Sequence, residues 1–187
     1  MKDFDTFDKW SLVAYAALLI AAIIASIVIY SNFTGAVAEA NKAVAKPYLD
    51  KYTEELSANS IMAATNIERM NNGLSPLVAD ERLIESSCKK LDDMVAGNYW
   101  AHISPTNRTP WQFIKEAGYN YRSAGENLAY GQKTVTSLMN AWLESPTHKE
   151  NILDKRWKDQ GVCTKLVNFQ NMQVSLTVHH FGSREAK

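Results

Sequence analysis

The chain has 187 residues, with 20 basic and 20 acidic side chains, 46% hydrophobic residues and 10% aromatic residues. The balanced charge argues against a nucleic-acid-binding protein, and the hydrophobic content excludes a disordered or collagen-like chain. The two cysteines, Cys88 and Cys163, are too few for a zinc ribbon or a disulfide-dense small scaffold. The length allows one ordinary domain and an accessory segment.

The N-terminal part contains an uncharged stretch between Lys9 and Glu39, and its most apolar portion is residues 12–30. As a helix, this portion would be roughly 28 Å long, close to the hydrocarbon thickness of a bilayer. The sequence therefore predicts a transmembrane anchor at residues 12–30, preceded by a tail of residues 1–11 and followed by a stalk of residues 31–46.

A cleaved secretory signal ending near Ala38 is the alternative interpretation. The apolar run is longer than the core of a signal peptide, and acidic residues precede it, so we favour an uncleaved anchor. Basic residues flank the apolar run in equal numbers on the two sides, so charge does not decide its orientation.

Residues 47–187 form the predicted folded domain, and its first part has apolar residues at helical spacing. Capping residues mark several helix starts, with Asp80 as an N-cap and proline at the first helical position after Thr109 and after Ser145. The predicted helices cover residues 47–71, 80–96, 110–118 and 134–143, with a further short helix beginning at Pro146.

Strands are predicted only late in the chain. Residues 160–167 and 172–181 are rich in β-branched side chains and alternate in polarity, and residues 168–171 between them predict a hairpin loop. Helices followed by a β-hairpin indicate an α+β layered domain rather than a βαβ fold.

Four residues are candidates for chemistry: His102, Glu126, Glu144 and His148. His102 lies in a loop after the second predicted helix, and a glycine precedes Glu126, which permits close approach of other groups. His148 falls in the first turn of a predicted helix, where the helix dipole disfavours a charged imidazole and leaves the neutral form that binds metals. Each of them alone has an ordinary structural explanation.

Several motifs in order carry more weight than any single residue. They are Asn66-Ile67-Glu68-Arg69, His102-Ile103-Ser104-Pro105, Gly125-Glu126-Asn127-Leu128-Ala129, Ala141-Trp142, Ser145-Pro146, His148, Asn151-Ile152-Leu153, Gly161-Val162 and Phe181-Gly182. Through them the chain resembles the CAP superfamily of cysteine-rich secretory proteins, antigen 5 and pathogenesis-related proteins, also called SCP domains, and particularly its short bacterial branch. The resemblance covers nearly all of residues 64–182.

The resemblance implies an α-β-α sandwich with a small antiparallel sheet between helical layers. It also implies a cleft with two histidines and two acidic residues, to which His102, Glu126 and His148 correspond. Glu144 is the candidate for the fourth position, although animal members place that acid one residue later, where this chain has Ser145. Such a set suits zinc or another divalent metal bound by His102 and His148.

Two classes of function follow from the resemblance. One is a membrane-anchored, extracytoplasmic CAP domain whose cleft binds a divalent metal, lipid, peptide or cell-envelope partner without turnover; a chain cleaved near Ala38 would be secreted. The other is a metal-dependent hydrolase of peptide, peptidoglycan or ester substrates, in which Glu126 deprotonates a bound water. We favour the first, because no nucleophilic serine or cysteine motif is visible.

The cysteines and the last two histidines need the tertiary fold for their interpretation. In an oxidising compartment Cys88 and Cys163 would form one disulfide, whereas two buried thiols are the alternative. His179 and His180 are adjacent in a predicted strand, so their side chains point to opposite faces of the sheet and cannot bind one metal together.

Overall fold

The computed structural model describes residues 20, 23–37, 39 and 56–184. The chain divides into two compact units, residues 1–44 and 45–187. In the first unit, residues 23–37 are helical. None of the helices in the described ranges has the length and hydropathy of a membrane span. Residues 12–19 and 21–22 of the predicted anchor lie outside those ranges.

The second unit is built from helices and one sheet. In chain order its elements are α2 (Ala58–Asn71), β1 (Val78–Ala79), α3 (Glu81–Ala96), α4 (Pro110–Glu116), β2 (Tyr121–Tyr130), α5 (Val135–Glu144), α6 (Pro146–Leu153), β3 (Asp159–Phe169) and β4 (Met172–Arg184). The α+β class predicted from the sequence is confirmed.

Local capping explains where the helices begin. The Asp80 side chain accepts a hydrogen bond from the backbone N–H of Arg82 at 3.0 Å and caps the N-terminus of α3, as predicted. Proline occupies the first position of α4 and of α6, where its missing N–H costs nothing. The first predicted helix was drawn too long, because α2 begins only at Ala58; residues 47–55 of that prediction lie outside the described part of the chain.

The sheet has the strand order β1-β3-β4-β2. Strands β3 and β4 form the predicted antiparallel hairpin, which turns through Gln170 and Asn171, both at positive φ. β2 pairs antiparallel with β4, and β1 pairs parallel with β3. Two expectations were therefore wrong: strands also occur before the hairpin, and the sheet is mixed rather than purely antiparallel.

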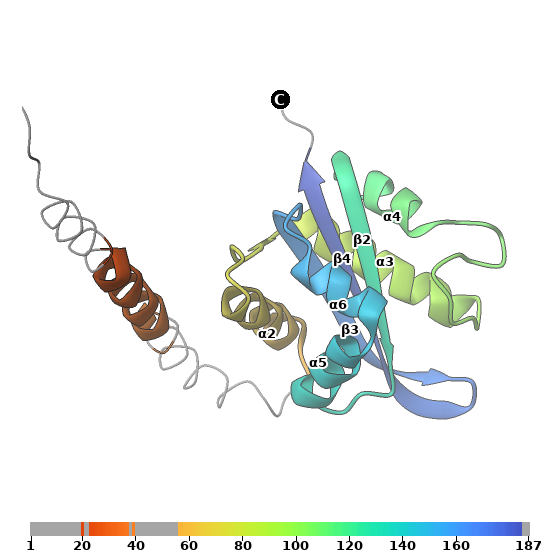
Figure 1. The fold of residues 1–187 in the computed structure, drawn as a ribbon. Helices are drawn as coiled ribbons and strands as arrows, with labels where there is room; N and C mark the ends of the chain where they lie inside the picture. The colour runs from red at the N-terminus through yellow and green to blue at the C-terminus, as the bar shows by residue number, and fades with distance from the viewer. Residues whose placement is uncertain (1–19, 21–22, 38, 40–55, 185–187) are drawn as a thin grey trace, which may run out of the picture. The chain divides into compact units, whose positions relative to one another are not determined.

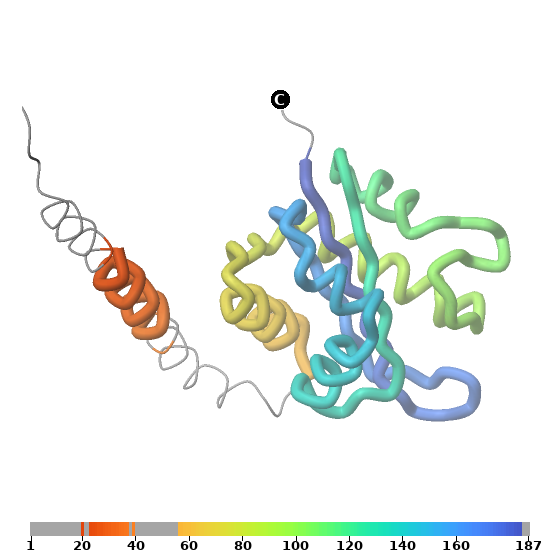
Figure 2. The backbone as a smooth tube through the Cα atoms, viewed as in Figure 1, coloured from red at the N-terminus to blue at the C-terminus, as the bar shows by residue number. Residues whose placement is uncertain are grey.

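Helices cover both faces of the sheet (Figure 1). α3 and α4 lie on one face, and α2, α5 and α6 lie on the other. Alternate residues of β4 serve the two faces: Val178 packs in a cluster with Leu91 of α3, whereas Phe181 packs in a cluster with Trp142 of α5. The backbone trace also shows the long loop of residues 97–109 between α3 and α4 (Figure 2).

Two contacts hold α3 close to β3. A Cβ atom added to Gly161 of β3 would lie 2.2 Å from the backbone nitrogen of Ile84, so only glycine fits there. Cys88 and Cys163 form a disulfide with their Cα atoms 5.0 Å apart. Of the two alternatives for the cysteines, the structure therefore contains the bridge.

Candidate functional site

A buried carboxylate lies at the centre of the site. Glu126 belongs to β2 and is the direct cross-strand partner of His180 on β4. Its side chain is 1% exposed, and both of its oxygens are hydrogen-bonded to imidazoles. His102 Nδ1 donates to Oε1 at 2.6 Å, and His180 Nε2 donates to Oε2 at 2.9 Å.

These two hydrogen bonds decide the charge of Glu126. Burial alone raises the pKa of a carboxyl group, but the hydrogen bonds and positive charge of His102 and His180 outweigh it and hold the pKa of Glu126 below its ordinary value. Glu126 is therefore ionised at neutral pH. Since an ionised carboxylate only accepts hydrogen bonds, each facing imidazole nitrogen carries a proton.

The hydrogen-bonded chain continues into α3. His180 is fully buried, and its Nδ1 lies 2.7 Å from Ser86 Oγ, which also lies 2.9 Å from the Leu83 carbonyl oxygen. The hydroxyl has a single proton, so it can donate to only one of these two neighbours. Ser86, His180, Glu126 and His102 thus form one chain of hydrogen bonds from the α3 interface to the surface.

His102 is the exposed end of this chain, with 55% of its side chain accessible. Because Nδ1 donates to Glu126, Nε2 is the nitrogen left available for a ligand. The backbone before it is held by the buried Lys90, whose Nζ donates to the Ala101 carbonyl at 2.9 Å and to the Tyr99 hydroxyl at 3.0 Å. His102 is thus oriented from both its ring and its backbone.

A cavity of 440 Å³ opens beside these residues, and we call it the histidine cavity. Its walls come from three places: the loop after α3 with the start of α4, the middle of β2, and Asn151 of α6. The loop and the start of α4 provide His102 and the exposed side chains of Ile103 and Trp111, and β2 provides Glu126. The volume lies within the range of about 300–1,000 Å³ that is typical of small-ligand sites.

His148 lies in the first turn of α6, as predicted, and its carbonyl accepts the Asn127 side-chain amide at 3.0 Å. Its Nδ1 is buried and has no hydrogen-bond partner in the described part of the chain. Burial lowers the pKa of His148, and the charge of nearby His102 lowers it further. His148 is therefore a neutral imidazole near His102, with an unused ring nitrogen.

A metal bound here would have at most two imidazole ligands from these side chains. Within the described ranges, no three His, Cys, Asp or Glu side chains form a metal-binding group. Glu126 already accepts from two imidazoles, which matches the outer carboxylate that orients a metal-binding histidine. The imidazole nitrogens that could ligate a metal are His102 Nε2 and the unpartnered Nδ1 of His148.

Glu144 is not brought to this place. It is the last residue of α5, it is exposed, and it lines a different cavity together with Lys149 and Asp154. Of the four predicted cleft residues, His102 and Glu126 line the histidine cavity and Glu144 lines a different one. His148 lines neither, although the charge of His102 acts on it.

Three supporting residues were not identified from the sequence: His180, Ser86 and Lys90. The prediction that His179 and His180 point to opposite faces is confirmed, since His180 meets Ser86 of α3 and His179 lies against Trp142 of α5. That alternation predicted on which face His180 lies but not that it contacts Glu126. The contact could not be predicted because residues 121–130 were not expected to form a strand beside β4.

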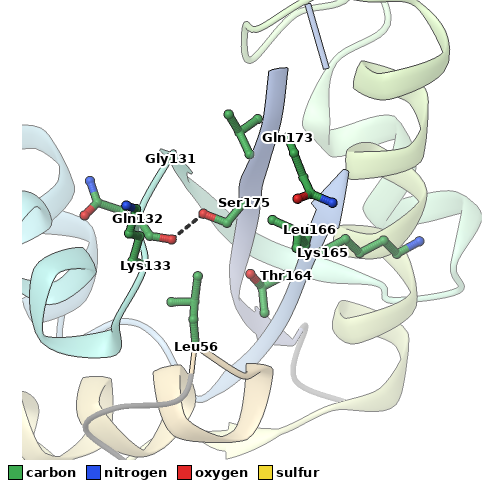
Figure 3. Close-up of a pocket in the computed structure, with 10 residues that line it drawn as sticks. Leu56, Gly131, Gln132, Lys133, Thr164, Lys165, Leu166, Gln173 and Ser175 are labelled. Atoms are coloured by element: carbon green, nitrogen blue, oxygen red, sulfur yellow. Dashed lines mark hydrogen bonds between the residues drawn. The ribbon is translucent and has the colours of Figure 1, made fainter. Parts of the chain in front are cut away.

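A second cavity, of 390 Å³, lies beside the β3–β4 hairpin (Figure 3). Residues Gly131 to Lys133 form one wall, and Thr164 and Leu166 of β3 contribute to another. The Ser175 hydroxyl donates to the Gln132 carbonyl across it. Among the described residues, its lining contains no histidine and no acidic side chain.

Comparisons with known proteins agree with this architecture. The chain is 42% identical over 102 residues to the uncharacterized protein YkwD of Bacillus subtilis (strain 168), covering 54% of this chain and 40% of that protein. It is 28% identical over 112 residues to the uncharacterized membrane protein YlbC of the same organism, covering 60% of this chain and 32% of that protein. The chain therefore spans less than half the length of these two relatives.

Solved structures share the fold. An extracellular protein containing an SCP domain from Bacillus anthracis str. Ames superposes with a TM-score of 0.59 at 25% identity, over 68% of this chain and 40% of that one. An outer surface protein from Borrelia burgdorferi gives a TM-score of 0.60 at 22% identity, over 67% of this chain and 90% of that one.

The family profile matches a long continuous segment, residues 62–165, which includes His102, Glu126 and His148. This match covers more than half of the sequence, and the fold around it is the one found in the SCP-domain structure. The chain belongs to the cysteine-rich secretory protein (CAP) family.

Proposed function

We propose that this protein is a membrane-anchored, extracytoplasmic CAP domain that binds a divalent metal ion through His102 and His148 and holds a lipid, peptide or cell-envelope ligand in the histidine cavity without turning it over. The observation that carries the proposal is the unpartnered, buried nitrogen of His148 near a His102 ring that Glu126 orients. A buried polar atom without a partner is costly unless a ligand satisfies it.

The anchor is supported by the apolar residues 12–30 and by the relative YlbC, which is named a membrane protein. The outside location is supported by the Bacillus anthracis neighbour, which is described as extracellular, and by the disulfide, since disulfides persist in oxidising compartments. Reporter fusions placed after residue 46 test the topology. Fusions that are active only in the cytoplasm would contradict it.

Metal binding is tested by titrating the full chain, in detergent micelles, with zinc in a calorimeter. Two protein ligands predict weak binding that declines on acidification, because protonated imidazole does not bind zinc. The double variant His102→Ala/His148→Ala should lose this binding, while Glu144→Ala, a carboxylate outside the histidine cavity, should retain it. Unchanged zinc affinity in the double variant would contradict the proposed site.

The second candidate function is a metal-dependent hydrolase of peptide, peptidoglycan or ester substrates. The observation that favours it is the 2.6 Å hydrogen bond from His102 to Glu126, in which a carboxylate orients a histidine that could hold a catalytic metal. A bound metal would supply an acidified water. Because Nε2 of His102 would ligate that metal, it could not also take the proton, so Glu126 would take it once one imidazole releases its oxygen.

One series of turnover and binding assays on the same protein preparations distinguishes the binding domain from the hydrolase. Turnover that is lost equally in His102→Ala, in Glu126→Gln and after metal removal supports the hydrolase. Ligand binding without turnover supports the binding domain.

A further inference from the structure

Strand β2 lies at the edge of the sheet that the described residues form, and there it pairs with β4 alone. In an antiparallel pair, the backbone groups of alternate residues point toward the partner and away from it. The amide of Gly131, one residue after β2, donates to the Ser175 carbonyl of β4 at 2.8 Å. From Ser123 onward, odd-numbered residues of β2 therefore bond to β4, and even-numbered residues present their N–H and C=O groups to the open edge.

Two side-chain contacts agree with this assignment. The Trp142 indole donates to the Leu128 carbonyl at 3.0 Å, and the Asn151 amide donates to the Glu126 carbonyl at 3.1 Å. Both acceptors are even-numbered residues of β2, and the donors belong to α5 and α6.

The open edge meets the histidine cavity at Ala124 and Glu126, which line it. Asn151 occupies the carbonyl of Glu126. Within the described part of the chain, the N–H of Glu126 and both backbone groups of Ala124 have no partner. One acceptor and two donors therefore remain unpaired on a strand edge at the cavity.

We propose that the histidine cavity binds an extended peptide, which adds to the edge of β2 as a further strand. The ligand forms main-chain hydrogen bonds with Ala124 and Glu126, the mode of recognition known as β-strand addition. This inference deepens the proposed function, on which it rests, by naming the ligand as a peptide. A glycan or a lipid tail has no regular alternation of amide donors and acceptors to match these groups.

The cavity also indicates which peptides bind. Ile103 and Trp111 are exposed to 53% and 37%, and both line the cavity from the loop side. Side chains of an added strand alternate between two directions, so every second residue of the peptide faces this apolar side. We expect the bound peptides to carry an apolar or aromatic residue there.

The experiment starts from a random heptapeptide display library, panned against the full chain in detergent micelles with zinc present. Selected peptides are synthesised, and their affinities are measured by fluorescence anisotropy. Trp111→Ala should weaken binding roughly tenfold, about the effect of 1.4 kcal/mol. Leu166→Ala removes an exposed apolar side chain from the cavity beside the hairpin and should leave the affinity unchanged.

Two measurements on the wild-type chain test the backbone contacts themselves. N-methylation along the peptide should weaken binding at alternate positions only, because every second amide of an added strand faces β2. Amide hydrogen exchange should slow on peptide binding at Ala124 and Glu126. The amides of Gly125 and Asn127, which already bond to β4, should change little.

The inference is overturned if no peptide is enriched, or if enriched peptides show neither alternating N-methyl effects nor protection of Ala124 and Glu126. It is equally overturned if N-acetylglucosamine tetramers or phosphatidylglycerol vesicles bind the cavity and the peptides do not. Zinc titration separates the two proposals: peptide binding without zinc binding removes the metal from the proposed function and leaves the edge-strand site standing.

Discussion

Replacing Glu126 by glutamine tests the centre of the site most directly. The substitution keeps the size and shape of the side chain and removes its charge. Glutamine can still accept from His102, and its amide can donate to His180 if that ring moves its proton to the nitrogen facing Ser86. The two hydrogen bonds therefore survive as neutral ones.

The magnitude follows from that change. A hydrogen bond to a charged group contributes about 1.5–3 kcal/mol and is roughly twice as strong as a neutral one. Each of the two bonds should therefore lose about 1 kcal/mol when the charge is removed. We expect Glu126→Gln to lower the free energy of unfolding by about 2 kcal/mol at pH 7. Because the pKa of Glu126 lies below its ordinary value of 4.5, this advantage is present above pH 4.5 and disappears as the pH falls through the lowered pKa.

The assay is urea unfolding of the full chain in detergent micelles, followed by circular dichroism. Glu144→Gln makes the same chemical change on an exposed side chain and should alter the free energy of unfolding by less than about 0.5 kcal/mol. If both variants are equally stable, the carboxylate does not bridge two imidazoles and the reasoning is refuted.

Three further predictions concern the scaffold around the site. Gly161→Ala should destabilise the domain by about 1–3 kcal/mol, because the new methyl group would overlap the α3 backbone. Urea unfolding measures this change, and an unchanged midpoint would mean that α3 does not lie against β3. Reduction of the Cys88–Cys163 disulfide, which spans 75 residues, should lower the free energy of unfolding by up to about 4 kcal/mol. Two free thiols, detected by mass spectrometry of the protein purified without reductant, would exclude the bridge. Burial holds the pKa of His179 well below 6.5, so below about pH 6.5 the unfolded chain binds a proton that the folded chain excludes. As the pH is lowered through this range, the free energy of unfolding should therefore fall by up to about 1.4 kcal/mol per pH unit. His179→Gln should flatten that slope in unfolding measurements across pH 5–7, and an identical slope would assign it to other groups.

Local sequence signals were sufficient for several elements. Asp80 caps α3, proline begins α4 and α6, and the alternation of β-branched residues marks β3 and β4. These predictions succeeded because capping, proline geometry and side-chain alternation act within a few residues. The predicted hairpin loop was too long only because Gln170 and Asn171 both adopt positive φ and close it in two residues.

Strand β2 shows where local signals stop. Residues 121–130 contain no β-branched side chain and include Gly125, so nothing local favours a strand. The segment is extended because it pairs with β4, more than 40 residues later in the chain. Without that pairing, Glu126 would be a carboxylate in a turn, and Nε2 of His180 would have no carboxylate partner.

The identities of His102, Glu126 and His148 as candidates came from motifs in the sequence, by resemblance to the CAP family. The sequence left the cysteines open between a disulfide and two thiols, and it left Glu144 as a candidate beside the other three. Only the tertiary structure separates these alternatives, because it joins α3 to β3 at Cys163 and places Glu144 in a different cavity. The physical reason is that hydrogen bonds and covalent contacts between residues far apart in sequence depend on how the layers pack, and no local pattern encodes that distance.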